Sequence, residues 1–146
     1  MVRFYSNDTL VTSSTTSGDW NTIGSYTNYS DDRIKSHEVE ILNATDTLNK
    51  LTPKIYDKHP FVRFPEDQED NDLSGVVVVF KESGFIAQEV LNNAPELDHL
   101  VKKPKDIDGL YGLNYVGLIP YLVKSNKELN EKITALTTRI ETLEKI

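Results

Sequence analysis

Residues 115–146 carry a strict seven-residue repeat of apolar side chains, and this repeat constrains the fold more than any other feature. Two series of positions form it: Ile119, Asn126, Ile133 and Ile140, and Leu122, Leu129, Leu136 and Leu143. Such a narrow seam is typical of a coiled coil, in which helices pack along their a and d positions. We therefore predict a self-associating helix over about residues 116–146. The alternative is an amphipathic helix that packs on its own domain.

The number of associating chains is left open by this seam. Isoleucine at the a positions with leucine at the d positions favours two strands in model peptides. A single asparagine at an a position, here Asn126, usually fixes the register of the helices. The repeat therefore predicts self-association rather than a particular copy number.

Residues 30–114 have the pattern of a small mixed domain. The expected elements are a helix over Glu38–Leu51 ended by Pro53, a strand over Lys54–Phe64, a buried strand over Val76–Phe80 that pairs with it as a long hairpin, and a short helix over Phe85–Asn93. Asp108-Gly109 is a turn signal between two short extended pieces. The predicted fold class is therefore α+β, with short helices and a long β-hairpin followed by the C-terminal helix.

Residues 1–29 are rich in Ser, Thr, Asn, Gly and Tyr, and their apolar side chains are few and scattered. A segment of this composition cannot form a core of its own. It is either a disordered tail or β structure that neighbouring copies of the chain complete. We expect the chain to be a fragment of something longer.

The composition excludes several classes of function. The formal net charge of −7 argues against nucleic-acid binding, because phosphate backbones require a basic surface. No apolar run approaches the roughly 20 residues that span a bilayer. The absence of cysteine excludes disulfides and thiolate metal sites. An acidic cluster lacks the spacing of a calcium-binding loop, so we expect a solvated loop and no metal there; its members are Glu66, Asp67, Glu69, Asp70 and Asp72.

The candidate reactive segment is residues 30–35, with the sequence SDDRIK. A serine needs a base to become a nucleophile, and a neutral lysine can replace histidine in that role. A tight bend or a first helical turn would return Lys35 to the Ser30 hydroxyl group. The alternative is structural, since serine followed by two acids is also typical of a helix N-terminus with Ser30 as its cap. Local chemistry alone favours this structural alternative.

A resemblance to a known family changes that balance. Residues 30–35, followed at their spacing by Ala44, Leu48, Leu51, Pro53 and Tyr56, look like the start of an intramolecular chaperone auto-processing domain. Such domains occur at the C-termini of phage endosialidases, tailspikes and tail fibres. The further motifs GFIAQEV at 84–90, APEL at 94–97 and LNY at 113–115 follow in the expected order. The resemblance covers residues 30–146 almost entirely.

The resemblance implies a homotrimer with a Ser–Lys dyad that cleaves the bond before the motif serine, here Tyr29–Ser30. Ser30 would be the nucleophile, and Lys35 would be the general base. Asp32 adds an acid beside the dyad, which would favour the charged amine of Lys35 and slow the reaction. The residues implied to support the site are Asp31, Arg33, Gln88 and Glu89.

The function that the resemblance implies is a C-terminal chaperone. Residues 30–146 would trimerise, template the folding of a viral fibre or tailspike, and then release themselves by autoproteolysis. Residues 1–29 would be the end of that fibre, and the expected partners are two further copies and the upstream segment of the same polypeptide. No cofactor, nucleic acid or membrane is expected; the fibre would belong to the virion, with the chaperone released in the host cytoplasm. The alternatives are a trimerisation module without cleavage and a receptor-binding fibre tip.

Overall fold

The computed structural model describes residues 3–6, 9–14, 20–22, 29–59, 80–106 and 109–145. These residues form two compact units, 1–39 and 40–146. Three predicted features lie wholly or partly outside the described residues: the acidic cluster at 66–72, the strand segments 60–64 and 76–79, and Asp108 of the predicted turn.

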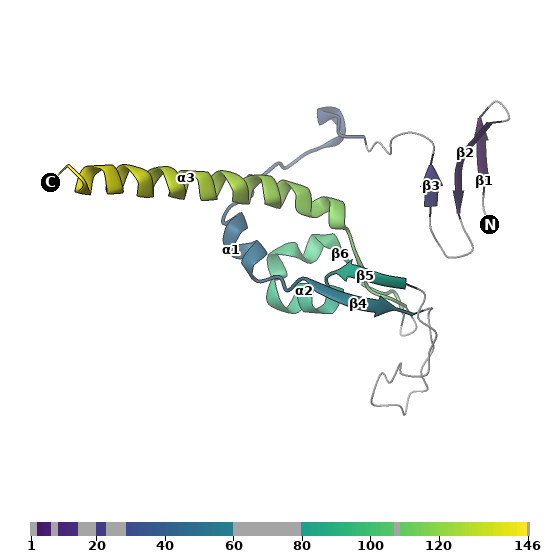
Figure 1. The fold of residues 1–146 in the computed structure, drawn as a ribbon. Coiled ribbons are helices and arrows are strands. Elements are labelled where there is room, and N and C mark those ends of the chain that lie inside the picture. The colour runs from purple at the N-terminus through teal and green to yellow at the C-terminus, as the bar shows by residue number, and fades with distance from the viewer. Residues whose placement is uncertain are drawn as a thin grey trace. The chain divides into compact units, whose positions relative to one another are not determined.

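The first unit contains a three-stranded antiparallel sheet in the order β1-β2-β3 (Figure 1). The strands are β1 (Arg3–Ser6), β2 (Thr9–Ser14) and β3 (Trp20–Thr22). Of the two alternatives for residues 1–29, the described parts show β structure. Its completion by neighbouring copies of the chain stays a prediction.

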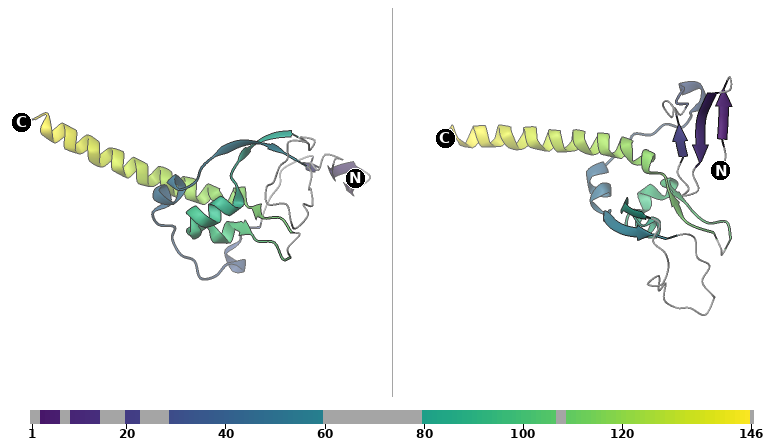
Figure 2. Two further views of the ribbon diagram at one scale, coloured as in Figure 1. Left: turned by 90° about the horizontal axis from the view of Figure 1, so that it is seen from below. Right: turned by 45° about the vertical axis from the view of Figure 1, so that its right-hand side comes forward.

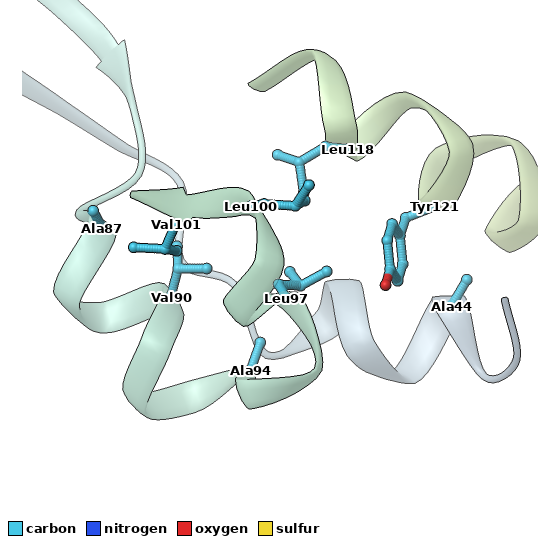
Figure 3. Close-up of a cluster of buried hydrophobic side chains, with 9 residues drawn as sticks. All are labelled: Ala44, Ala87, Val90, Ala94, Leu97, Leu100, Val101, Leu118 and Tyr121. Carbon is cyan, nitrogen blue, oxygen red and sulfur yellow. The ribbon is translucent and has the colours of Figure 1, made fainter. Parts of the chain in front are cut away.

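The second unit is a mixed α+β domain with a small apolar core, which confirms the predicted fold class. Its helical elements are α1 (Ala44–Asn49), α2 (Ala87–Asn93), the 3-10 helices η2 (Pro95–Leu100) and η3 (Tyr115–Leu118), and α3 (Ile119–Leu143). The buried apolar side chains come from all of these elements and surround Leu97, which is fully buried (Figure 3). The core residues are Ala44, Ala87, Val90, Ala94, Leu97, Leu100, Val101, Leu118 and Tyr121.

Two short antiparallel sheets complete the second unit. Strand β4 (Lys54–Lys58) pairs with β5 (Phe80–Gly84), so that Lys54 lies opposite Gly84. The first strand of the predicted hairpin is confirmed over Lys54–Lys58, but its observed partner begins only at Phe80, and the predicted pairing of 60–64 with 76–79 lies outside the described residues. Strand β6 (Val101–Lys102) pairs with β7 (Gly112–Leu113), which confirms the two short extended pieces around the predicted turn.

The helix predicted over Glu38–Leu51 is wrong in its first part, because α1 begins only at Ala44. Asn43 has a left-handed backbone with φ 54°, which interrupts any helix from the preceding residues. Two apolar residues of the predicted stripe, Val39 and Leu42, are 91% and 65% exposed. Without a surface to cover these side chains, the stripe does not hold a helix there.

The short helix predicted over Phe85–Asn93 is confirmed as α2, which ends before Pro95. The long C-terminal helix is confirmed as α3, which has 25 residues and follows the single turn η3. In the second unit, the other elements lie against the first turns of α3, and its C-terminal half projects beyond them (Figures 1 and 2). Within the described ranges, no helix has the length and apolar character needed to span a membrane.

Helix α3 has two separate faces. Tyr121 and Ser125 are buried against the domain, and neither belongs to the seven-residue seam. The apolar seam side chains remain between 45% and 60% exposed in the single chain; they are Ile119, Leu122, Leu129, Ile133, Leu136, Ile140 and Leu143. Packing on its own domain therefore uses only the first turns of the helix and leaves the seam available.

Candidate functional site

The structure brings Ser30 and Lys35 together. Lys35 Nζ donates a hydrogen bond of 2.7 Å to Ser30 Oγ, and both side chains are exposed. Between them lies a single 3-10 turn, η1 (Asp32–Ile34), which the Lys35 backbone amide closes by donating to the Asp32 carbonyl oxygen at 3.0 Å. The tight bend required by the sequence prediction is therefore present.

Asp31 and Arg33 hold this turn. The Asp31 carboxylate accepts hydrogen bonds from the Arg33 backbone amide at 2.9 Å and from Arg33 Nε and a terminal guanidinium nitrogen at 2.9 and 2.8 Å. Charged, two-pronged contacts of this kind are stronger and more directional than neutral hydrogen bonds. The hydrogen bonds from the Arg33 side chain and then its backbone amide lower the pKa of Asp31 below its usual value, which keeps it ionised.

The alternative that made Ser30 a helix cap is wrong. The cap of η1 is Asp31, whose side chain accepts from the amide of Arg33, whereas the Ser30 hydroxyl group engages Lys35. Asp31 thus caps and orders the turn, and Ser30 Oγ accepts a hydrogen bond from Lys35 Nζ.

The backbone just after the turn adopts an uncommon conformation at His37. His37 has a left-handed backbone with φ 56°, which is uncommon for a residue with a side chain. Its ring nitrogen Nδ1 lies 3.0 Å from Ser36 Oγ. A residue held in this region typically marks a sharp change of chain direction.

Gln88 and Glu89 lie on α2 in the second unit. Glu89 forms an ion pair with Lys54 and so joins α2 to β4, while Gln88 is exposed. A structural role for Glu89 is therefore visible. The predicted support of the reactive site by these two residues stays a prediction.

Two of the sequence motifs meet around Tyr115. The Tyr115 hydroxyl group accepts a hydrogen bond of 2.9 Å from the Phe85 amide, and the two rings stack. A Cβ atom at Gly84 would lie only 2.3 Å from the Tyr115 hydroxyl oxygen and 2.8 Å from that of Tyr56. The motifs at 84–90 and 113–115 thus pack against each other through Gly84, Phe85 and Tyr115.

Sequence reasoning missed the polar contacts that join α1 to α3. The Glu128 carboxylate accepts from the backbone amides of Ala44 and Thr45, which lie at the start of α1. Lys124 donates to Glu40 at 2.8 Å, just before that helix. No local spacing could have indicated these pairs, because their members lie 83 or 84 positions apart in the chain.

The described residues do not form a candidate metal site. They contain no group of three or more His, Asp or Glu side chains placed to hold an ion. The site chemistry discussed below therefore uses only the serine, the lysine and their neighbours.

The second unit is a small α+β domain that ends in a long helix, and the exposed Ser–Lys pair lies in the first unit, before it in the chain. Residues 30–99 match the family model described as the chaperone of endosialidase, so this section of the chain is similar to that family. The match indicates a chaperone-type role, and the name of the matched family suggests serine peptidases. No curated protein matches the sequence significantly.

Proposed function

We propose that residues 30–146 trimerise, template the folding of an upstream viral fibre, and then cleave the Tyr29–Ser30 bond. The observation that carries this proposal is the 2.7 Å hydrogen bond between Lys35 Nζ and Ser30 Oγ, in a segment that matches the chaperone family. A serine and a lysine at this distance form the minimal nucleophile and base pair of a serine peptidase.

The cleavage starts at the serine oxygen. Ser30 Oγ attacks the carbonyl carbon of Tyr29, and Lys35 takes the hydroxyl proton and passes a proton to the Ser30 nitrogen. The peptide bond breaks as an ester forms between Tyr29 and the Ser30 side chain. Water then hydrolyses this ester, which leaves a carboxylate on Tyr29 and a free amine on Ser30.

Assembly would promote this reaction through burial of the pair. In the single chain both side chains are exposed to water. Removal of the amine from water favours its neutral form, which can accept the serine proton. Trimerisation that covers the pair would therefore switch on cleavage after the chains have assembled.

The exposed seam of α3 supports association with further copies of the chain. In a parallel arrangement, a g position of one helix faces an e position of the next, which pairs Arg139 with Glu144 of a neighbour. Asn126 then meets its own counterparts in one layer, whereas an antiparallel arrangement would place it against leucine. Charge and polarity thus both favour parallel helices in register.

Templating follows from this register. Residues 1–29 of three chains would be held side by side, which raises their local concentration and lets the fibre fold from its C-terminal end. Release of the chaperone removes the reverse path, so the virion fibre becomes kinetically stable. A trimerisation module without cleavage remains the second candidate, supported by the same exposed seam.

Mass spectrometry of the purified chain tests the cleavage. We expect a fragment that begins at Ser30 in the wild type and its absence in Ser30→Ala and Lys35→Ala. Ser36→Ala is the matched control and should cleave, because the Ser36 hydroxyl group lies 3.0 Å from His37 Nδ1 and is not part of the dyad. An intact wild-type chain under trimeric conditions would overturn the peptidase and leave the module.

Analytical ultracentrifugation tests the assembly. A trimer is expected for the wild type and for Thr134→Asp, whose change lies off the seam. Ile133→Asp places a charge in the seam and should yield monomers. A monomeric wild type would overturn the whole proposal, and a dimer would overturn its trimeric form.

A further inference from the structure

Helix α1 begins without a cap of its own. It has six residues, and the preceding Asn43 is left-handed and makes no side-chain hydrogen bond to the helix. The first amides are instead satisfied from α3: Ala44 donates to Glu128 Oε1 at 3.1 Å, and Thr45 donates to Glu128 Oε2 at 2.9 Å. Glu128 thus caps a helix that lies far from it in the chain.

A buried pair of hydroxyl groups reinforces this cap. Thr45 Oγ1 donates to Glu128 Oε2 at 2.8 Å and lies 3.0 Å from Ser125 Oγ. Thr45 and Ser125 are both buried, so water cannot easily replace these contacts. We call Thr45, Ser125 and Glu128 the α1–α3 clamp.

A second contact fixes the chain just before α1. Lys124 Nζ donates to Glu40 Oε1 at 2.8 Å, one turn of α3 before Glu128. Glu40 lies five positions after Lys35 along the chain. Five positions along the chain therefore separate Lys35 from a residue that α3 holds.

The clamp and the seam use different faces of α3. In the seven-residue repeat Glu128 occupies a c position and Ser125 a g position, whereas the apolar seam consists of a and d positions. Both sets of contacts can form at the same time. One helix can therefore bind further copies of the chain and hold α1.

We propose that the α1–α3 clamp makes the order of residues 40–49, and through them the position of the reactive turn, depend on α3. A six-residue helix is too short to persist in water without tertiary support, so loss of its cap releases the segment. Glu128 and Thr45 are on this view positioning residues that act through α1. The link to cleavage rests on the proposed function, whereas the dependence of α1 on Glu128 does not.

Amide hydrogen exchange tests the clamp without any cleavage. In a Ser30→Ala chain, Glu128→Gln replaces one of the two acceptor oxygens with an amide nitrogen, which donates and cannot accept from the helix. We expect the amides of α1 to exchange at least about fivefold faster, the change expected for loss of a helix cap. The matched control Glu141→Gln lies on α3 away from the clamp and should leave exchange unchanged. Unchanged exchange in Glu128→Gln would overturn the clamp.

Cleavage kinetics test the positioning role. With Ser30 intact, Thr45→Val should slow release of the fragment by about tenfold while the assembly persists, and Thr45→Ser, which keeps the hydroxyl group, should restore it. Wild-type cleavage in Thr45→Val, with α1 exchanging faster, would overturn positioning. If the wild type itself does not cleave, the proposed function and the positioning role both fail, and the exchange experiment still decides the clamp.

Discussion

The hydroxyl group of Tyr115 accepts a 2.9 Å hydrogen bond from the amide of Phe85, and the two rings stack with their centroids 6.1 Å apart. This contact joins the turn that leads into α3 to the residue that follows β5. The Tyr115 hydroxyl oxygen thus serves as the hydrogen-bond acceptor of the Phe85 amide. Tyr115 therefore fixes the hairpin against the base of the long helix.

Tyr115→Phe removes this acceptor while it keeps the ring. We expect a loss of about 1 kcal/mol in the free energy of unfolding, as is typical for one hydrogen bond at a partly exposed position. Urea denaturation measures it. Tyr111→Phe is the matched control, because Tyr111 is 40% exposed, against 42% for Tyr115. Equal stability of the two variants would contradict the structural role of the contact.

Gly84→Ala tests the close approach beneath the same ring. The added methyl group would lie 2.3 Å from the Tyr115 hydroxyl oxygen, so the ring must move and give up its hydrogen bond. We expect a loss of about 1–3 kcal/mol in the free energy of unfolding. Gly112→Ala is the control, since its nearest neighbour would lie at 3.7 Å, an ordinary contact. Thermal unfolding of both variants should show a lower midpoint only for Gly84→Ala.

Acidification should weaken the attachment of α1 to α3. Hydrogen bonds from the backbone amide and hydroxyl group of Thr45 lower the pKa of Glu128, with smaller effects from Ala44 and Lys124; Lys124 likewise lowers the pKa of Glu40. A carboxylate whose pKa is lowered by folding stabilises the fold above its unfolded pKa, and this contribution is lost as the pH falls through the folded value. The free energy of unfolding should therefore decrease as the pH falls below 4.5, the ordinary pKa of these carboxyl groups.

Urea denaturation between pH 7 and 3 measures this fall at constant salt concentration. Glu128→Gln should show a shallower dependence than the wild type, because one of the responsible groups is absent. Glu141→Gln should follow the wild-type curve. A Glu128→Gln curve as steep as that of the wild type would show that other carboxylates cause the acid sensitivity.

Arg33→Lys tests the turn that presents the proposed dyad. Lysine keeps the charge but cannot make the two-pronged contact with Asp31, so the turn should loosen. We expect release of the fragment at Ser30 to slow by about tenfold, followed by mass spectrometry over time. Arg139→Lys, on the exposed part of α3, should cleave at the wild-type rate. Full activity in Arg33→Lys would mean that the backbone alone sets the turn.

The parts of the fold that the sequence predicts are those with a local periodic signal. The seam of α3 and the helix before Pro95 follow from spacing, and the first strand of the hairpin follows from a β-favouring run. The start of α1 could not be predicted, because the stripe includes Val39 and Leu42, which the chain leaves exposed. Only a tertiary cap explains where that helix begins.

The candidate site divides in the same way. The contact of Lys35 with Ser30 could be predicted, because the two residues lie five positions apart and a single turn brings them together. The family resemblance was needed to favour Ser30 as a nucleophile over Ser30 as a helix cap. The sequence could not predict that Asp31 rather than Asp32 caps the turn, because the two adjacent acids are equivalent in sequence. The clamp could not be predicted, because Thr45, Ser125 and Glu128 belong to no motif and meet only in three dimensions.

The capping of α1 by Glu128 has a consequence for the order of folding. The contact closes a loop of 83 or 84 residues, and a long loop must pay its closure entropy before the contact can stabilise anything. Helix α1 should therefore be among the last elements to form, although it comes early in the chain. During synthesis it would have to wait until Glu128 has left the ribosome, so a truncated chain would reach the solvent with this part unformed.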